Sequence, residues 1–490
     1  MLMCPPNPVS PNSRVLDRHV STCLSFVTFA ILTALFLAAN NVGAAENSEK
    51  SAVNFNALAS TPPMGWNSWD CLGLDANEAQ VKAVADYMAA HLKKYGWQYV
   101  VIDAGWFHPK QLTTGKSHTV DPPQNLDGFG RLIPDTGKYP SSANGVGFKA
   151  LADYVHCKGL KFGIHIMRGI PWNAVANKTP IKGTSYFAPD VANLKDVCNW
   201  SPIMKGVDMS KPGAQAYYDS VFDLYAEWGV DFVKVDDMPL PAHAAEIEAV
   251  HQAILNSKTP IVFSLSSNVT PLNQKNYLAQ AAHMWRISND FWDDWKWLKQ
   301  QFDICRQWDS PRPPGRWPDA DMLPIGKLRK TGGDAWIASQ LGSTIDKVTD
   351  EYSRFTDPEK YTLMTLWCIF NSPLMLGGYL PENDAITVKL ITNDEVIAVD
   401  QKSVNNHEVR NRDGIVIWTA DQPGTQAKYV AIFNLNDVRS ENVSLPWKEI
   451  GLSGKLKVRD LWPKKNLGKF DKTFTAKIEP HGCVLVKIGG

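Results

Sequence analysis

The chain has 490 residues, and its 50 Lys and Arg side chains balance 50 Asp and Glu side chains, so the formal net charge is zero. This length corresponds to two or three domains, or to one large barrel with an addition, and a hydrophobic content of 44% is ample for a core. A nucleic-acid partner requires an excess of basic residues, so the balanced charge argues against one. The 18 Trp residues suit a protein that stacks on sugars, although core packing explains most of them.

Residues 1–45 have the layout of a secretory signal peptide that is removed from the mature protein. Arg14 and Arg18 precede an uncharged apolar run at 24–39, and small residues follow it before Glu46. A membrane span needs about 20 apolar residues, so this run favours cleavage over an uncleaved anchor, which is the alternative. We therefore expect a secreted, extracellular (cell wall) or vacuolar protein with no stable membrane association. Glycosylation sequons compatible with that route stand at Asn177, Asn268 and Asn442.

The cysteines and glycines give no sign of a metal or nucleotide site. The cysteines beyond the leader are Cys71, Cys157, Cys198, Cys305, Cys368 and Cys483. None has CxxC spacing, and Cys157 and Cys368 stand in apolar helical patterns typical of a core. No GxGxxG or P-loop motif is present. We therefore expect neither a metal nor a cofactor.

From residue 61 to about 402, short β-rich runs alternate with amphipathic helices. Asp75, with Glu78 three residues later, predicts the start of a helix that ends at Gly96, and a second helical pattern covers 212–228. The predicted buried strands are YVVIDAG (99–105), LKFGIHI (160–166), DFVKVDD (231–237), PIVFSLS (260–266) and PLMLGGY (373–379).

Repeated strand, helix, strand units predict a parallel sheet with helices outside it. Their number favours the α/β class and a closed (β/α)8 TIM barrel over residues 61–402, with 46–60 as a linker. After 403 the pattern changes to short alternating strands, namely GIVIWTA, KYVAIFNL, KLKVRDLW, FTAKIEP and CVLVKIG. Residues 403–490 are therefore predicted to form a C-terminal antiparallel β-sandwich domain.

The strand at 231–237 ends in charged residues. Because side chains alternate along a strand, Lys234 and Asp236 share one face and the neighbouring valines take the other. Catalytic groups of such barrels lie at the carboxyl ends of the strands, where Asp236 falls. Acids at strand ends are nevertheless more often solvated caps or structural ion pairs, so this pair alone is weak evidence for catalysis.

A second acidic segment, HMWRISNDFWDDW (283–295), strengthens a catalytic interpretation. Cleavage of a glycosidic bond by a retaining enzyme requires one ionised carboxylate as nucleophile and one protonated carboxyl group as acid. Lys234 would keep Asp236 ionised, whereas Asp290, without such a partner, could have a raised pKa and hold the proton. The ordinary alternative is that Asp290, Asp293 and Asp294 are acids on a solvated helix start.

The motifs TPPMGWNSWD, VIDAGW, FVKVDD, WRISND, WPDADMLPIG, VIAVDQ and RDLWPKKNLG together resemble the α-galactosidase family of retaining glycoside hydrolases (melibiase-like), which includes β-L-arabinopyranosidases. They run in the same order from about residue 61 to the C terminus. The resemblance implies a TIM barrel followed by an antiparallel β domain, with Asp236 as nucleophile and Asp290 as acid/base. It also implies an oligosaccharide or cell-wall glycan as substrate. The residues that it places around the sugar are Trp66, Asp103, Lys234, Arg286, Asp321 and Met322.

Three positions around the sugar depart from the family pattern. Many α-galactosidases have a second Asp where this chain has Ala104, and that Asp contacts the O4 and O6 side of the sugar. Ser267 and Asn268 replace a Glu and a Trp near the 2-hydroxyl. Ala104 and Ser267 are therefore expected to influence specificity. The main expectation is release of terminal non-reducing α-D-galactosyl residues, the second is β-L-arabinopyranosidase activity, alone or alongside it, and the remote one is a non-catalytic galactose-binding, lectin-like protein.

Overall fold

The computed structural model describes residues 54–110, 123–199, 201–266, 268–310, 312–330 and 351–489. The expected signal peptide, most of the expected linker and Ser267 lie outside these ranges. None of the helices within them has the length and apolar character that crossing a bilayer requires.

A curled parallel sheet makes up the first part of the described structure. Its strands are hydrogen-bonded in the order β10-β9-β8-β7-β3-β2-β1-β13. A parallel bridge between Leu323, just after β10, and Leu376 in β13 links the two edges. The predicted TIM-barrel architecture is therefore confirmed. The strands are β1 (Met64–Asn67), β2 (Tyr99–Ile102), β3 (Lys161–Met167), β7 (Phe232–Asp236), β8 (Val262–Leu265), β9 (Met284–Arg286), β10 (Trp317–Asp319) and β13 (Leu374–Leu376).

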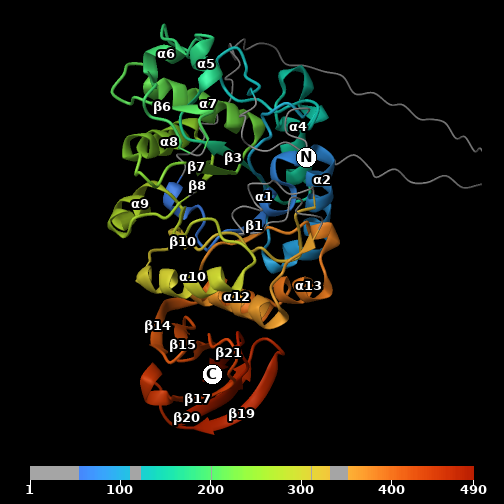
Figure 1. Cartoon of the computed structure of the whole chain (residues 1–490), viewed down its shortest axis with the longest axis vertical. Coiled ribbons are helices and arrows are strands. Elements are labelled where there is room, and N and C mark those ends of the chain that lie inside the picture. Colours follow the sequence, from blue (N-terminus) through green and yellow to red (C-terminus); the bar gives the residue numbers. More distant parts are fainter. Residues whose placement is uncertain are drawn as a thin grey trace, which may run out of the picture. The chain divides into compact units, whose positions relative to one another are not determined.

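Helices surround these strands (Figure 1). They are α1 (Trp69–Leu72), α2 (Glu78–Tyr87), α4 (Lys149–Cys157), α5 (Trp172–Ala176), α6 (Ala188–Val191), α7 (Ala214–Trp228), α8 (Ala244–Ser257), α9 (Lys275–Ala281), α10 (Trp295–Gln307), α12 (Asp357–Phe370), α13 (Ala385–Ile391) and α14 (Asp394–Lys402). Small antiparallel pairings join β4 (Ile170–Pro171), β6 (Met204–Val207) and β5 (Ala192–Asn193), and also β11 (Lys327–Leu328) and β12 (Glu351–Tyr352).

Two local expectations about helices were wrong. Helix α2 begins at Glu78 and not at Asp75, because Asn77 is its N-cap and forms the capping box with Gln80. Asp75 belongs to a preceding 3-10 turn. Cys368 is buried as predicted, but Cys157 is exposed, because it is the last residue of α4 and lies outside the apolar stripe of that helix.

Strands β2 and β7 change from apolar to polar along their inward faces. Tyr99, Val101 and Phe232 belong to one buried apolar cluster together with residues of β8, β9 and β13. Because side chains alternate, the next inward positions toward the carboxyl end are occupied by Asp103 after β2 and by Lys234 in β7. The apolar cluster therefore fills the lower barrel, and the polar residues lie at the face where barrel enzymes have their active sites.

The C-terminal strands form two antiparallel sheets. One has the order β14-β15-β16-β21-β18-β19, and the other pairs β17 with β20. This agrees with the predicted β-sandwich. Their bounds are β14 (Val404–Arg412), β15 (Ile415–Asp421), β16 (Lys428–Asn434), β17 (Glu441–Pro446), β18 (Lys455–Asp460), β19 (Lys465–Asp471), β20 (Thr473–Ile478) and β21 (Cys483–Ile488).

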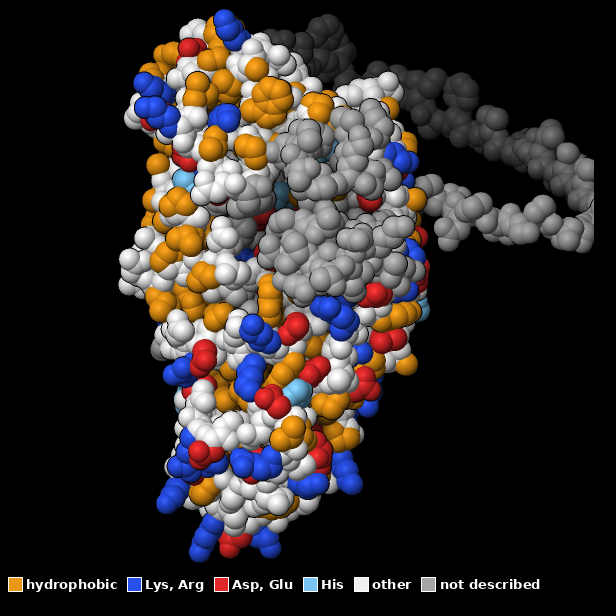
Figure 2. Space-filling model, viewed as in Figure 1, with side chains coloured by type: hydrophobic (Ala, Val, Ile, Leu, Met, Phe, Trp, Pro, Cys, Tyr) orange, Lys and Arg blue, Asp and Glu red, His pale blue; other side chains and the backbone are white. Residues whose placement is uncertain are grey.

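Helix α12 connects the barrel to the C-terminal sheet. Thr362 Oγ1 donates to the His481 carbonyl over 2.6 Å, and Trp462 Nε1 donates to Thr365 Oγ1 over 2.9 Å. Phe370 packs edge-on against Trp418. Because side chains of both parts enter one buried cluster, the larger C-terminal sheet shares a core with the barrel helices. On the visible face of this C-terminal region, basic and acidic side chains are interspersed (Figure 2).

Candidate active site

The predicted nucleophile, Asp236, is the last residue of β7 and lies beside the end of β3. The parallel register pairs His165 with Lys234, and Met167 with Asp236. Asp236 is largely buried, at 9% exposure. Lys234 Nζ lies 3.9 Å from Asp236 Oδ1, and His165 Nε2 lies 3.0 Å from Asp236 Oδ2. Each carboxylate oxygen therefore faces a nitrogen of a different side chain, although Oδ1 accepts no hydrogen bond from the described residues.

These neighbours determine the charge state of Asp236. Burial alone would raise the pKa of this carboxyl group, but Lys234 and His165 outweigh burial and hold the pKa well below its usual range. Burial also acts against the charged form of Lys234, and Asp103 and Asp236 reverse that effect, so the pKa of Lys234 is raised. The pair is therefore an ammonium and a carboxylate at neutral pH.

Asp103 holds Lys234 in place from the end of β2. Its Oδ2 lies 2.9 Å from Lys234 Nζ and accepts a 2.6 Å hydrogen bond from Asn67 Nδ2. Its backbone N–H donates to Ser68 Oγ over 2.9 Å. Burial would raise the pKa of Asp103, yet Lys234 and then His165 lower it. The GWNSWD motif thus orients the carboxylate that positions the lysine.

The predicted acid/base, Asp290, lies in the loop after β9. Its Oδ1 is 3.1 Å from Arg286 Nη2, and its side chain is 40% exposed. The expectation that Asp290 has no cationic partner was therefore wrong, because Arg286 at the end of β9 reaches the loop that follows. The same Nη2 lies 2.8 Å from Asp321 Oδ2, so one guanidinium serves two carboxyl groups.

The pKa of Asp321 is strongly perturbed. Burial raises the pKa of Asp321 to about 7, although Arg286 opposes this effect. The residue has a φ of +87°, a strained conformation for a residue with a side chain. Its Oδ2 also accepts a 2.7 Å bond from the Phe291 backbone N–H. These bonds hold Asp321 in the strained conformation and tie it to the loop that carries Asp290.

The remaining predicted sugar contacts differ in accessibility. Trp66 is fully enclosed, at 0% exposure, and its indole N–H donates to the Gly378 carbonyl over 2.8 Å. Met322 belongs to the apolar cluster of the lower barrel. Ala104 is partly exposed next to Asp103. The roles of Trp66 and Met322 at the sugar stay predictions.

The acids after Asp290 do not form a solvated helix start as a group. Asp294 caps α10 by accepting from the Lys296 backbone N–H. Asp293, however, is buried and pairs with Arg329 over 3.0 Å, and Arg354 also contacts it. The solvated alternative is therefore wrong for Asp293, because the sequence does not reveal that two distant arginines converge on it.

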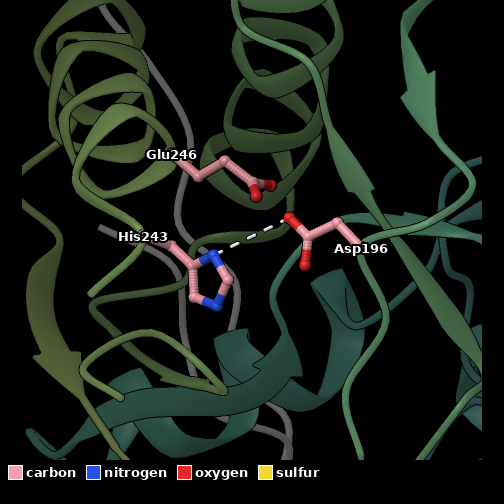
Figure 3. A group of neighbouring side chains, drawn as sticks. All are labelled: Asp196, His243 and Glu246. Carbon is pink, nitrogen blue, oxygen red and sulfur yellow. Dashed lines mark ion pairs between the residues drawn. The ribbon is translucent and has the colours of Figure 1, made fainter. Parts of the chain in front are cut away.

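A separate polar cluster lies behind Asp237. Asp196, His243 and Glu246 approach one another closely enough to reach one metal ion (Figure 3). Arg168 already occupies this cluster, since its Nη1 is 2.6 Å from Glu246 Oε1 and 3.0 Å from Asp196 Oδ2. The guanidinium of Arg168 supplies the positive charge that balances these acids. The cluster is therefore an ion-pair network in which arginine takes the place that a metal ion would have.

Several site residues were missed by sequence reasoning. Asn67, Ser68 and His165 contact the groups around Asp236, and Asp319 at the end of β10 accepts from the Asp321 backbone N–H over 2.9 Å. All of them stand in or beside motifs or strands that had been recognised. The available signal was their inward position at a strand end, which period-two alternation gives for His165.

Comparison with known proteins gives consistent matches. Residues 412–488 match the family model "Alpha galactosidase C-terminal beta sandwich domain", and residues 202–337 match "Alpha galactosidase A". The chain is 26% identical to Alpha-galactosidase 2 of Arabidopsis thaliana, over 95% of this chain and 97% of the relative.

The similarity to a solved bacterial structure is greater. The chain is 44% identical to a GH27 β-L-arabinopyranosidase from Geobacillus stearothermophilus, covering 88% of this chain and 97% of that one with a TM-score of 0.82. A variant of that enzyme in complex with arabinose matches at 43% identity, over 90% of this chain and 100% of that one, with a TM-score of 0.83. At this identity and coverage, the chain belongs to the GH27 (melibiase) family of glycoside hydrolases.

Proposed function

We propose that this protein is a retaining glycoside hydrolase that releases terminal non-reducing α-D-galactosyl residues from glycans by double displacement. Asp236 is the nucleophile and Asp290 is the general acid/base. The observation that carries this proposal is the carboxylate of Asp236, held ionised between Lys234 and His165 at the carboxyl end of a barrel strand. A carboxylate kept ionised in a buried site is poised to attack an anomeric carbon.

The first step breaks the glycosidic bond. An Asp236 oxygen attacks the anomeric carbon while the departing glycosidic oxygen takes the proton of Asp290, which leaves a covalent glycosyl ester on Asp236. In the second step Asp290 removes a proton from water, and the water oxygen displaces Asp236 at the same carbon. Two inversions give net retention and restore both carboxyl groups. The 40% exposure of the Asp290 side chain suits its contact with both the leaving group and water.

The sugar would lie over the polar ends of the strands. The charged side chains of the proposed sugar site are Asp103, Lys234, Arg286 and Asp321. Its apolar side chains are Trp66 and Met322. The ion pairs of Asp103 with Lys234 and of Arg286 with Asp321 support this assignment, since they fix both sides of the site. The substrate class is therefore an oligosaccharide or cell-wall glycan with an exposed terminal sugar.

β-L-Arabinopyranosidase activity is the second candidate, and Ala104 favours it. An α-D-galactopyranoside and a β-L-arabinopyranoside share their stereochemistry from C1 to C4, and only galactose has the exocyclic CH2OH. Sites that hydrogen-bond a hydroxyl strongly reject analogues that lack it, whereas packing alone discriminates by about 1 to 3 kcal/mol. The Ala104 side chain has no hydrogen-bonding group, so selectivity for galactose should fall. The similarity to a β-L-arabinopyranosidase supports this candidate as well.

Product stereochemistry tests the proposal directly. Proton NMR of aryl α-D-galactoside hydrolysis should show the α anomer of galactose first, and a first-formed β anomer would contradict retention. A slow fluorosugar substrate should leave a covalent label on the peptide that contains Asp236. If the protein binds galactose and turns over neither aryl glycoside, the lectin-like alternative is correct.

We also propose that residues 1–45 are a cleaved signal peptide, with 46–60 as linker, 61–402 as catalytic barrel and 403–490 as β domain. Secretion to the cell wall or delivery to the vacuole follows from that leader. Sequencing the N terminus of the mature chain tests it, because cleavage should leave an N terminus near residue 45. A mature chain that retains its first residues would contradict the proposal.

A further inference from the structure

We propose that His165 is a positioning residue for the nucleophile, donating an Nε2 hydrogen bond to Asp236 and orienting its carboxylate for attack. This inference rests on the proposed function, since it assigns a partner to the nucleophile named there. His165 lies in a strand that the sequence predicted, but its place beside Asp236 comes from the register between β3 and β7.

The imidazole is confined to one interaction. His165 is 1% exposed, and its Nε2 lies 3.0 Å from Asp236 Oδ2. Among the described residues, neither ring nitrogen makes a hydrogen bond that meets the usual angular criteria, so the 3.0 Å approach of Nε2 to Asp236 Oδ2 is an ion-pair contact. A carboxylate only accepts hydrogen bonds, so Nε2 must carry a hydrogen toward it. The contact between Nε2 and Asp236 Oδ2 is therefore the polar interaction of this buried ring with the described residues.

The backbone of His165 is held from the opposite side. Trp106 Nε1 donates to the His165 carbonyl over 2.7 Å. Trp106 is itself buried and packs edge-on against Phe107, Phe148 and Trp228. This rigid support fixes the point on β3 from which the imidazole reaches across to β7.

The two donors beside Asp236 have different tasks. Lys234 is 3.9 Å from Oδ1 and closer to Asp103, so it contributes mainly charge to the nucleophile. His165 is at hydrogen-bond distance from Oδ2 and supplies direction. A buried ring aimed at one oxygen limits rotation of the carboxylate, and small errors in the placement of a nucleophile reduce rates strongly.

Two substitutions separate donation from bulk. In His165→Gln the side-chain amide nitrogen can take the place of Nε2, whereas in His165→Asn the shorter amide falls short of Asp236. We expect His165→Asn to lower kcat/KM by about 10- to 100-fold, the loss of one hydrogen bond to a charged group, and His165→Gln to stay within about 5-fold of wild type. The Asn loss should be equal for an activated aryl galactoside and for an α-galactosyl oligosaccharide, because both need the same nucleophile.

His283 provides the matched control. It is also a buried barrel histidine, but its Nδ1 accepts from the Phe263 backbone N–H and its Nε2 lies 2.9 Å from the Phe55 carbonyl. His283→Asn should lower the melting temperature and leave kcat/KM per active site, counted by fluorosugar trapping, unchanged.

Equal values of kcat/KM for the Gln and Asn variants at His165 would overturn the inference. A loss of kcat/KM confined to the oligosaccharide would also overturn it, because it would indicate an effect on the general acid, Asp290. Counting active sites by trapping corrects for any unfolded fraction of either variant. If wild type cleaves neither substrate, the proposed function itself is wrong and the inference falls with it. An active wild type with indistinguishable variants overturns the inference alone.

Discussion

Lys234 Nζ and Asp103 Oδ2 lie 2.9 Å apart, although β3 separates the strands that carry them. The ion pair passes over the end of the intervening strand and links β2 to β7. His165 lies in that intervening strand, and both it and Lys234 reach Asp236. The nucleophile is therefore contacted by Lys234 of β7 and His165 of β3, and Asp103 after β2 holds the lysine in place.

Lys234→Met should lower kcat/KM by at least about 100-fold, because Asp103 and Asp236 lose the cation that opposes their burial. The acid limb of the pH–rate profile should also move to higher pH, since removing the cation raises the pKa of the nucleophile. Lys161→Met, at the exposed start of β3, is the control and should leave both quantities unchanged. An unshifted acid limb in Lys234→Met would contradict this role.

Asp236→Ala and Asp290→Ala should differ in their dependence on the leaving group. Asp236→Ala should abolish turnover even of activated aryl glycosides, because the variant lacks the group that forms the covalent intermediate. Asp290→Ala should retain far more activity on activated leaving groups than on oligosaccharides, since a good leaving group needs little protonation. Measuring kcat/KM across a series of aryl galactosides checks both expectations. Equal losses across the series in Asp290→Ala would argue against its role as acid.

Ala104→Asp should shift selectivity toward galactose, because the new carboxylate can hydrogen-bond the CH2OH side of the sugar. The measurement is the ratio of kcat/KM for aryl α-D-galactoside to that for aryl β-L-arabinopyranoside, in wild type and in the variant. An unchanged ratio, or a wild type that already prefers galactose by about 10^4-fold, would show that position 104 is not the selector.

Asp70→Asn should stabilise the protein increasingly as pH rises. Burial and then the nearby Asp321 raise the pKa of Asp70 well above its usual value, and its Oδ2 has no hydrogen-bond partner among the described residues. A raised carboxyl pKa costs nothing below the unfolded-state pKa, and the cost grows as pH rises toward the folded-state pKa. The gain in unfolding free energy should therefore be small at pH 4 and increase by about 1.4 kcal/mol per pH unit above it. Urea unfolding at several pH values measures this slope, and a gain independent of pH would contradict it.

Asp293→Ala should destabilise the fold by about 3 to 5 kcal/mol, because Arg329, which is 2% exposed, loses its close buried partner and keeps only Glu351 at 3.9 Å. Asp303→Ala is the matched control, since Asp303 and Arg306 form an exposed pair at 2.7 Å. That substitution should cost less than about 1 kcal/mol. Chemical denaturation compares the two, and equal costs would show that the buried pair has no special weight.

Local pattern was sufficient for much of the fold. The five strands predicted in the barrel region correspond to β2, β3, β7, β8 and β13, and the helix predicted at 212–228 is α7. Their apolar runs are long enough for periodicity to be read. Strands β1, β9 and β10 were not predicted, because Trp, Arg, Pro, Asn or Asp interrupts their apolar runs. These three strands are defined by their pairing with neighbouring strands in the closed sheet.

The sequence by itself determined which residues could do the chemistry. Alternation placed Lys234 and Asp236 on one face of a strand, and seven ordered motifs indicated the family. Only the tertiary structure decided that Asp103 reaches Lys234, that Arg286 serves both Asp290 and Asp321, and that His165 lies against the nucleophile. These contacts depend on how parallel strands are offset and closed into a barrel, and side chains up to 131 residues apart meet only once that register exists.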